Sequence, residues 1–178
     1  NGYFLTDYFP CGNDWTIKEI SPSPGYLLDE TVYHMAAYAE YFTVELNTVY
    51  YDCYEQVIKG NILIAKHSDI APDGAEIDTP EKGAEFKVYL KSSGSYENAK
   101  ESERDILITD EDGFAITKDL PYGTYTVKQT KGLEGTDIMK PFDVYINEEG
   151  KVYKYMINNA IFEALIEIVK KDAETGKI

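Results

Sequence analysis

The sequence is poor in cysteine and histidine and has no long apolar run, and each shortage excludes a class of protein. Two cysteines and two histidines in 178 residues make neither a disulfide scaffold nor a zinc site. No apolar stretch approaches the roughly 20 residues needed to cross a bilayer. The first residues lack the charged and then apolar layout of a signal peptide. We therefore expect no membrane insertion in this segment and no targeting address within it.

Basic residues are also scarce, because 17 lysines and arginines face 32 acidic side chains, which gives a formal net charge of −15. Nucleic-acid binding needs clustered positive charge to neutralise phosphates, so it is excluded, and anionic membrane surfaces are disfavoured for the same reason. With 43% hydrophobic and 13% aromatic residues, the chain is too apolar for a disordered acidic tail. We expect a folded, soluble protein of one domain or two small ones.

Motifs of catalysis and cofactor binding are missing from the sequence. It has no glycine-rich phosphate loop and no nucleophile elbow, and it implies no cofactor. The acidic stretch DEDG at 110–113 has too few oxygen ligands for a calcium loop and predicts a hairpin turn. Glu148 and Glu149 would need a cleft to act as a glycosidase pair, and nothing indicates one. We expect no enzyme that turns over repeatedly.

One short segment occurs twice, 104 residues apart. GNILIAKHSD at 60–69 is repeated as ALIEIVKKD at 164–172, with the lysines at 66 and 170 in register. Between these copies, PYG followed by YTVKQ resembles an earlier PCG followed by WTIKE. We therefore predict the C-terminal part of one module in 1–59, a complete module in 60–163 and the first strand of a third in 164–178.

Apolar residues of the complete module alternate over short runs between turn signals, which predicts strands with one face inward. The fold class is then all-β, an antiparallel β-sandwich built of tandem modules. Two polar stretches, 29–41 and 95–101, are candidates for minor helical insertions, the first with tyrosine and alanine at helical spacing (Tyr33, Ala37, Tyr41). The residues predicted to point inward are Phe86, Val88, Leu90, Ile106, Ile108, Tyr125, Val127, Phe142, Val144, Ile146, Tyr153, Tyr155 and Ile157.

Polar residues extend several apolar rows, because residues i and i+2 of a strand share a face. Lys66 continues the row of Ile62 and Ile64. Amides, an acid and a second lysine continue other rows, so a lysine, an amide and an acid or amide are all aimed at the core end of one sandwich. The other extending residues are Asn159 after Ile157, Gln129 after Val127, Glu19 after Ile17, and Lys170 after Ile168.

A buried lysine supports a specific chemistry. An unpaired buried ammonium is costly, so the group tends to lose its proton and become a nucleophilic amine. Beside a carboxamide polarised by a buried, protonated acid, such an amine attacks the amide carbon and expels ammonia, which leaves a Lys–Asn isopeptide bond. The alternative is that Lys66 lies at a strand end and reaches solvent, balanced by neighbouring acids. Parity alone favours this alternative.

The order of these segments resembles a known family. The stretches that carry the likeness are ILIAKHSD, GAEFKVYL, ITDEDGFAITKDLPYGTYTVKQ, INNAIFEALIEIVKKDAETGK and WTIKEISPSPGYLLDE. They are similar to the Cna protein B-type, or SpaA-like prealbumin-fold, repeats of Gram-positive surface proteins, over nearly the whole chain. The resemblance implies tandem immunoglobulin-like or prealbumin-like modules in cell-wall-anchored adhesins and pilin-like stalks. Many such modules are locked by a Lys–Asn bond that an acid assists.

The resemblance also assigns roles to residues of the complete module. Lys66 corresponds to the nucleophile and Asn159 to the acceptor amide. The family's glutamate falls on Gln129, and a glutamine cannot shuttle a proton. The bond is therefore formed with help from another acid, formed slowly, or absent.

The partial modules have equivalent positions. Glu19 keeps the acid, Glu55 occupies the asparagine position and is a poor acceptor, and Lys170 would serve the third module. Because the first module lacks its lysine strand, residues 164–178 of one molecule are expected to complete residues 1–58 of another by strand addition. The alternative is that the missing parts were removed from a longer protein.

The expected function is a structural spacer of a bacterial cell-surface adhesin or pilin-like protein, whose partners are neighbouring modules of the same polypeptide. The rival is a binding module for carbohydrate or a host protein, because exposed aromatic rings bind both. We prefer the interpretation that half of the crowded tyrosines fill a core and the rest brace neighbouring modules. Pairing of Cys11 with Cys53 is left open. These tyrosines are Tyr33, Tyr38, Tyr41, Tyr50, Tyr51 and Tyr54.

Overall fold

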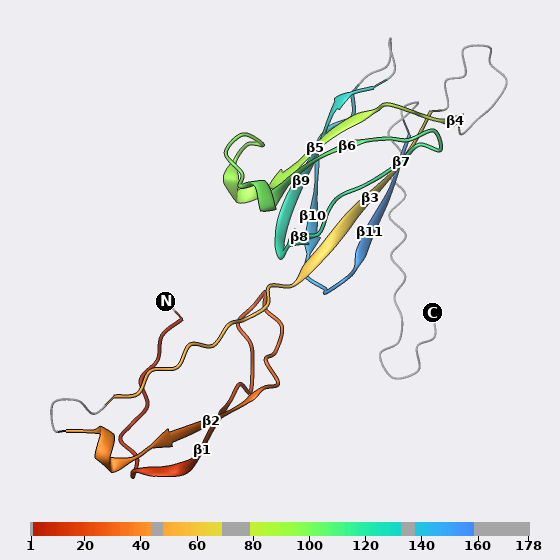
Figure 1. The fold of residues 1–178 in the computed structure, drawn as a ribbon. Helices are drawn as coiled ribbons and strands as arrows, with labels where there is room; N and C mark the ends of the chain where they lie inside the picture. The colour runs from red at the N-terminus through yellow and green to blue at the C-terminus, as the bar shows by residue number, and fades with distance from the viewer. Residues whose placement is uncertain (1, 44–47, 69–78, 133–137, 159–178) are drawn as a thin grey trace, which may run out of the picture. The chain divides into compact units, whose positions relative to one another are not determined.

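The structure, a computed structural model, describes residues 2–43, 48–68, 79–132 and 138–158 (Figure 1). The chain divides into two compact units, Asn1–Ile58 and Lys59–Ile178. Among the described residues, no helix is long and apolar enough to cross a membrane. The division into three modules stays a prediction, and its last segment, 164–178, lies outside the described residues.

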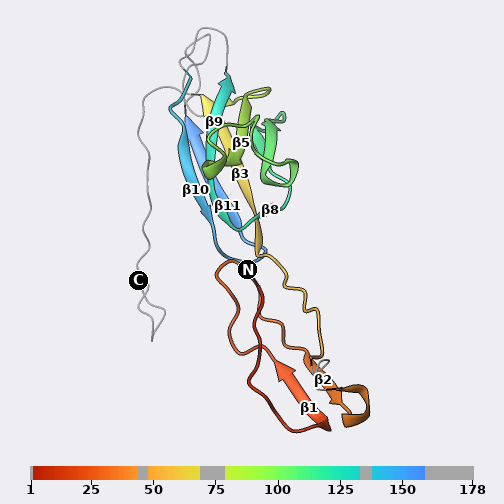
Figure 2. The same ribbon diagram turned by 90° about the vertical axis from the view of Figure 1, so that its left-hand side faces the viewer.

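The second unit is a sandwich of two sheets (Figures 1 and 2). One sheet has four antiparallel strands in the order β10-β9-β5-β6. The other is centred on β3, which pairs with β11 and with the short strands β4, β7 and β8. The pair β3–β11 is parallel, so the first and last strands among the described residues of this unit run side by side. The strands are β3 (Lys59–Ser68), β4 (Thr79–Pro80), β5 (Glu85–Leu90), β6 (Arg104–Ile108), β7 (Phe114–Ile116), β8 (Leu120–Pro121), β9 (Gly123–Lys131), β10 (Phe142–Ile146) and β11 (Val152–Asn158).

The core of the second unit lies between the two sheets. Alternate residues of β3, β5, β9 and β10 are fully buried there, which confirms the predicted period of two. Tyr125 is buried as well, and its hydroxyl donates to the carbonyl oxygen of Pro121 over 2.8 Å. Tyr153 and Tyr155 of β11 pack against this core as partly buried residues. The apolar rows that end at Lys66 and Gln129 therefore face the interior.

The predicted inward face of β6 is wrong. Ile106 and Ile108 are 44% and 62% exposed, whereas Leu107 between them is only 2% exposed. Leu107 lies opposite Phe86 in the ladder with β5, and this register places it on the core face. Residues 106–108 are all apolar, so the sequence does not show which face is inward, and the register with β5 leaves the two isoleucines on the outer face.

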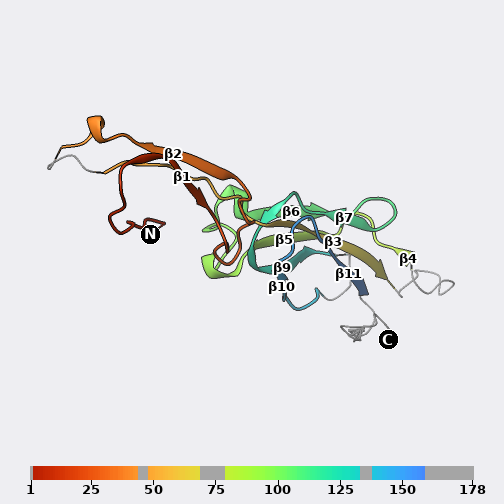
Figure 3. The same ribbon diagram turned by 90° about the horizontal axis from the view of Figure 1, so that it is seen from below.

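The first unit contains a two-stranded antiparallel sheet of β1 (Gly12–Lys18) and β2 (Val32–Ala37) (Figure 3). The helix predicted over 29–41 is wrong, because β2 occupies its middle and only Ala39–Tyr41 form a 3-10 turn. Met35 and Ala37 alternate with exposed residues, so the true period is two and the spacing of the tyrosines misled the prediction. The apolar row that leads to Glu19 was predicted to be buried, and this prediction is wrong, because Trp15 is 40% exposed.

The second predicted helical insertion, 95–101, consists mainly of turns. Short 3-10 helices lie on both sides of it, Lys91–Ser93 and Glu101–Glu103. The helical content among the described residues is thus limited to single 3-10 turns, as the fold class with minor helical insertions requires.

Candidate functional site

Lys66 lies in the interior of the second unit. Its side chain is fully buried, and its Nζ lies 2.7 Å from Oε2 of Glu81, whose side chain is only 1% exposed. The Nζ also donates to the carbonyl oxygen of His67 over 2.8 Å. The predicted inward orientation of Lys66 is confirmed. The alternative, that this lysine reaches solvent, is wrong, although an acid does balance its charge.

Glu81 is the residue of this site that the sequence interpretation missed. It lies between β4 and β5, outside any strand, so no row of alternating residues pointed to it. Its backbone N–H donates to the carbonyl oxygen of Lys66 over 2.9 Å, and its own carbonyl accepts from Oγ1 of Thr109 over 2.6 Å. These bonds fix the backbone of Glu81 against β3. The one available signal was indirect: with a glutamine at the family's acid position, help from another acid was one of the three outcomes left open.

Gln129 is buried, at 1% exposure, but its amide serves the backbone of its surroundings. Its Nε2 donates to the carbonyl oxygen of Lys131 over 3.2 Å, and its Oε1 accepts from the backbone N–H of Met139 over 3.1 Å. Within the described part of the chain, no hydrogen bond joins Gln129 to Lys66 or Glu81. Among the described residues, Glu81 is the acid in contact with the lysine, and the amide of Gln129 bonds to backbone groups instead.

The parallel pairing of β3 with β11 brings the end of β11 alongside Lys66. In this ladder Ile157 is the partner of Lys66 and Asn158 is the partner of His67. Asn159, the predicted acceptor, follows directly in the sequence and lies outside the described residues. Lys170 lies outside them as well.

The equivalent positions of the first unit are close to each other. Oε2 of Glu19 accepts a hydrogen bond from the backbone N–H of Asp29 over 2.7 Å. Partial desolvation and the neighbouring Glu19 carboxylate, which also hydrogen-bonds to it, raise the pKa of Glu55. Glu19 and Glu55 therefore lie close together, and their equivalence to positions of the second unit stays a prediction.

The Lys66–Glu81 pair is costly to break. Two charges removed from water are stable only when they compensate each other, and removal of one partner from such a pair costs about 3–5 kcal/mol. In a low-dielectric interior, the pair also has an alternative without charge, in which the proton moves from Nζ to the carboxylate. The site can therefore supply a neutral amine and a protonated acid in contact, the two groups that amide exchange at a carboxamide needs.

Thr109 is expected to hold Glu81 in place. Its buried Oγ1 donates to the carbonyl oxygen of Glu81 and accepts from the backbone N–H of Ala84 over 2.9 Å. Thr109→Val leaves both backbone groups unsatisfied, and we expect the free energy of unfolding to fall by about 2 kcal/mol. Thr109→Ser keeps the hydroxyl and should cost less than half as much. Urea denaturation of both variants measures the difference, and equal losses would contradict the role of the hydroxyl.

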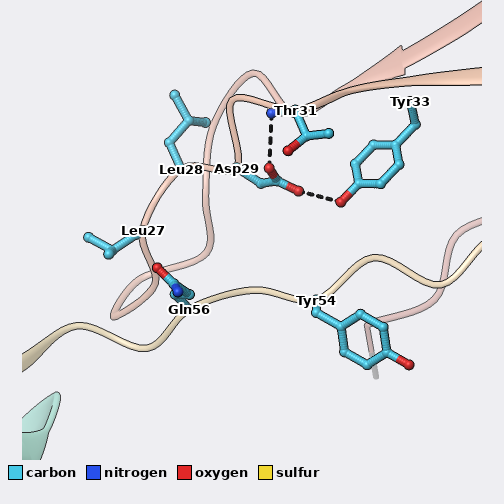
Figure 4. Close-up of a pocket in the computed structure, with 7 residues that line it drawn as sticks. All are labelled: Leu27, Leu28, Asp29, Thr31, Tyr33, Tyr54 and Gln56. Carbon is cyan, nitrogen blue, oxygen red and sulfur yellow. Dashed lines mark hydrogen bonds between the residues drawn. The ribbon is translucent and has the colours of Figure 1, made fainter.

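The first unit has a small polar pocket of about 280 Å³ (Figure 4). Asp29 at its wall accepts hydrogen bonds from the backbone N–H of Thr31 and from the hydroxyl of Tyr33, over 2.9 and 2.6 Å. The bond to Asp29 raises the pKa of Tyr33 to about 12. Its wall residues are Leu27, Leu28, Asp29, Thr31, Tyr33, Tyr54 and Gln56.

The expectation that half of the crowded tyrosines fill a core is wrong. Only Tyr33 is half-buried, and the other five are exposed. Their surroundings in the described residues comprise a two-stranded sheet, which offers too little surface to bury them. Recognition of a carbohydrate or host protein by this unit stays a prediction.

The remaining predicted features have structural roles. Oδ1 of Asp110 accepts from the backbone N–H groups of Asp112 and Phe114, which confirms a turn at 110–113. The predicted hairpin is wrong, because β6 pairs with β5 and β7 pairs with β3, so the turn joins the two sheets. The described residues contain no group of three or more histidine, cysteine or acidic side chains placed to hold a metal ion. Cys11 and Cys53 are exposed, free thiols, so they do not form a disulfide with each other in this structure.

The fold and site of the second unit define a prealbumin-like β-sandwich, in which the strand β3 carries a buried lysine paired with an acid. The sequence matches the SpaA family, described as a prealbumin-like fold domain, over residues 72–161, just over half of the chain. The chain belongs to this family. A comparison with curated proteins gives no match.

Solved structures with a similar fold include proteins of several Gram-positive bacteria. The Bacillus anthracis TIE protein is 27% identical, with a TM-score of 0.62 over 85% of this chain and 26% of that chain. A minor pilin of Streptococcus agalactiae is 22% identical, with a TM-score of 0.44 over 60% of this chain and 47% of that one. The shaft pilin SpaA of Lactobacillus rhamnosus GG is 19% identical, with a TM-score of 0.43, over 66% and 56% of the two chains. The present chain thus spans about a quarter of the TIE protein.

Proposed function

We propose that this chain is a structural spacer segment of a multi-domain protein on the surface of a Gram-positive bacterium, with an internal Lys66–Asn159 isopeptide bond in its second unit. Membership of the SpaA family and the similarity to the TIE protein support the spacer role. The observation that carries the bond is the buried Lys66–Glu81 pair beside the end of β11. Partners are then neighbouring modules of the same polypeptide, and self-association through residues 164–178 belongs to the same proposal.

The bond joins the two strands that a stretching force loads first. A stalk module is pulled through its first and last strands, and here these are β3 and β11, which lie side by side in parallel. Hydrogen bonds alone let such strands slide past each other. A covalent bond between positions 66 and 159 carries the force directly and leaves the 92 residues between them unloaded. Unlike a disulfide, this bond resists reduction.

Formation of the bond is a single reaction during folding. The neutral Nζ of Lys66 attacks Cγ of Asn159, the new N–C bond forms, and the C–N bond to the side-chain nitrogen of Asn159 breaks. That nitrogen leaves as ammonia after it gains a proton, while Nζ loses one. The protein is consumed as its own substrate, so the spacer is not an enzyme with turnover.

Intact mass measures the proposed bond directly. The folded protein is expected to have a mass lower than its sequence mass by one ammonia. Lys66→Met removes the nucleophile and should restore the full mass of that variant. Lys59→Met, at an exposed lysine of the same strand, is the matched control and should keep the deficit. A wild-type protein with its full sequence mass would show that no Lys–Asn bond forms.

A further inference from the structure

Glu81 stands where the proposed reaction needs a group that carries protons. Its carboxylate is 2.7 Å from the Nζ of Lys66, which is the reacting atom, and both side chains are at most 1% exposed. Such a charge-assisted contact lets a proton pass between the two groups without a water molecule. The contact comes from a loop between β4 and β5, whereas the family's acid position, Gln129, lies within β9.

Gln129 cannot substitute for Glu81 in this step. A carboxamide has no titratable proton at physiological pH. Both ends of the Gln129 amide are also engaged by backbone groups, at Lys131 and Met139. Position 129 therefore holds a buried side chain where the family has its acid, but this side chain cannot transfer a proton.

The backbone of Glu81 is held in a fixed position. It donates to the carbonyl oxygen of Lys66 and accepts from Thr109, and the next glycine, Gly83, donates to the carbonyl oxygen of Thr109 over 2.9 Å. A fixed acid needs little reorganisation when charge develops on the reacting groups, and preorganisation of this kind is a main source of rate acceleration.

We propose that Glu81 is the catalytic acid and base of the Lys66–Asn159 crosslink, an assignment that rests on the crosslink proposed above. The carboxylate first takes a proton from the ammonium of Lys66, which frees the amine for attack on Cγ of Asn159. The protonated acid then gives its proton to the leaving nitrogen, and the carboxylate takes a second proton from Nζ. One ammonia and one proton leave in total, and Glu81 ends as it began.

Intact mass of full-length variants tests this assignment. Glu81→Met has a similar length but no carboxyl, and it introduces no amide that could itself react with Lys66. We expect the folded variant to keep its full sequence mass over days, while wild type has lost one ammonia. Gln129→Leu is the matched control at the other buried position, and it should lose ammonia as wild type does. Circular dichroism verifies that each variant is folded.

Glu81→Asp keeps the test decisive if Glu81→Met does not fold. Aspartate can still carry the proton, but its side chain is shorter by one methylene, so its carboxyl group lies farther from Nζ. Ammonia loss should therefore be about 100-fold slower than in wild type. Ammonia loss in folded Glu81→Met, or at the wild-type rate in Glu81→Asp, would overturn the role of Glu81 and leave the crosslink intact. Wild type at its full sequence mass would overturn both proposals.

Discussion

Asn159→Ala is expected to lower the free energy of unfolding of the second unit by about 4–5 kcal/mol, because it prevents the crosslink, and Lys66 and Glu81 then keep their buried ion pair. The loop that the bond closes runs from Lys66 to Asn159, and 92 residues lie between them. In the chain-entropy account of cross-links, a closed loop of about 100 residues removes about 4.7 kcal/mol of conformational entropy from the unfolded state at 25 °C. Denaturation in guanidinium chloride measures the loss.

Asn158→Ala provides the control for this experiment. Asn158 precedes the predicted acceptor and ends β11, opposite His67. Its replacement should leave the mass deficit of one ammonia in place and lower the free energy of unfolding by about 1 kcal/mol. If both alanine variants lose the same stability, or if Asn158→Ala alone restores the full mass, the acceptor is not Asn159.

The central strands were predictable because the sandwich buries one face of each. In the middle of β5 and β9 alternate residues, such as Phe86, Val88 and Val127, are fully buried, and the sequence shows the same period. The row on β3 extends to Lys66, and its burial followed from the same rule. A polar residue that continues such a row is therefore informative about the interior.

Edges and partial modules were not predictable by the same rule. Ile106 and Ile108 alternate as core residues would, but Leu107 between them is apolar as well, and the register with β5 selects Leu107 for the core. In the first unit the spacing of the tyrosines is typical of a helix, but residues 32–37 form the strand β2, which pairs with β1. Sequence patterns show that a segment has two faces, while the partner strand decides which face is covered.

The acid of the site was unpredictable for a different reason. Glu81 reaches Lys66 from a loop, and its position depends on backbone hydrogen bonds to Lys66 and Thr109 that no periodicity indicates. The glutamine at position 129 made a replacement acid one of the possibilities, but the sequence offers 32 acidic residues as candidates. The fold was needed to choose among them.

Gly113→Ala is expected to lower the free energy of unfolding by about 3 kcal/mol or more, through its effect on the lysine strand. Gly113 has φ of +78°, which an L-residue rarely adopts, and an added Cβ would lie 2.4 Å from the backbone carbonyl oxygen of Lys66. The carbonyl of Gly113 also accepts from the backbone N–H of Lys66 over 2.7 Å. The substitution therefore displaces β3 at Lys66, the residue that must stay aligned with Glu81 and the end of β11.

Gly150→Ala separates the backbone effect from the steric one. Gly150 has φ of +66°, similar to that of Gly113, but nothing lies within 4 Å of an added Cβ. It should lose only the left-handed penalty of about 1 kcal/mol and keep the mass deficit of one ammonia. Gly113→Ala should in addition slow the ammonia loss, because the reacting groups are displaced. Equal stabilities of the two variants would show that β3 yields to the extra methyl, and that the close approach of the turn to Lys66 does not hold the strand in register.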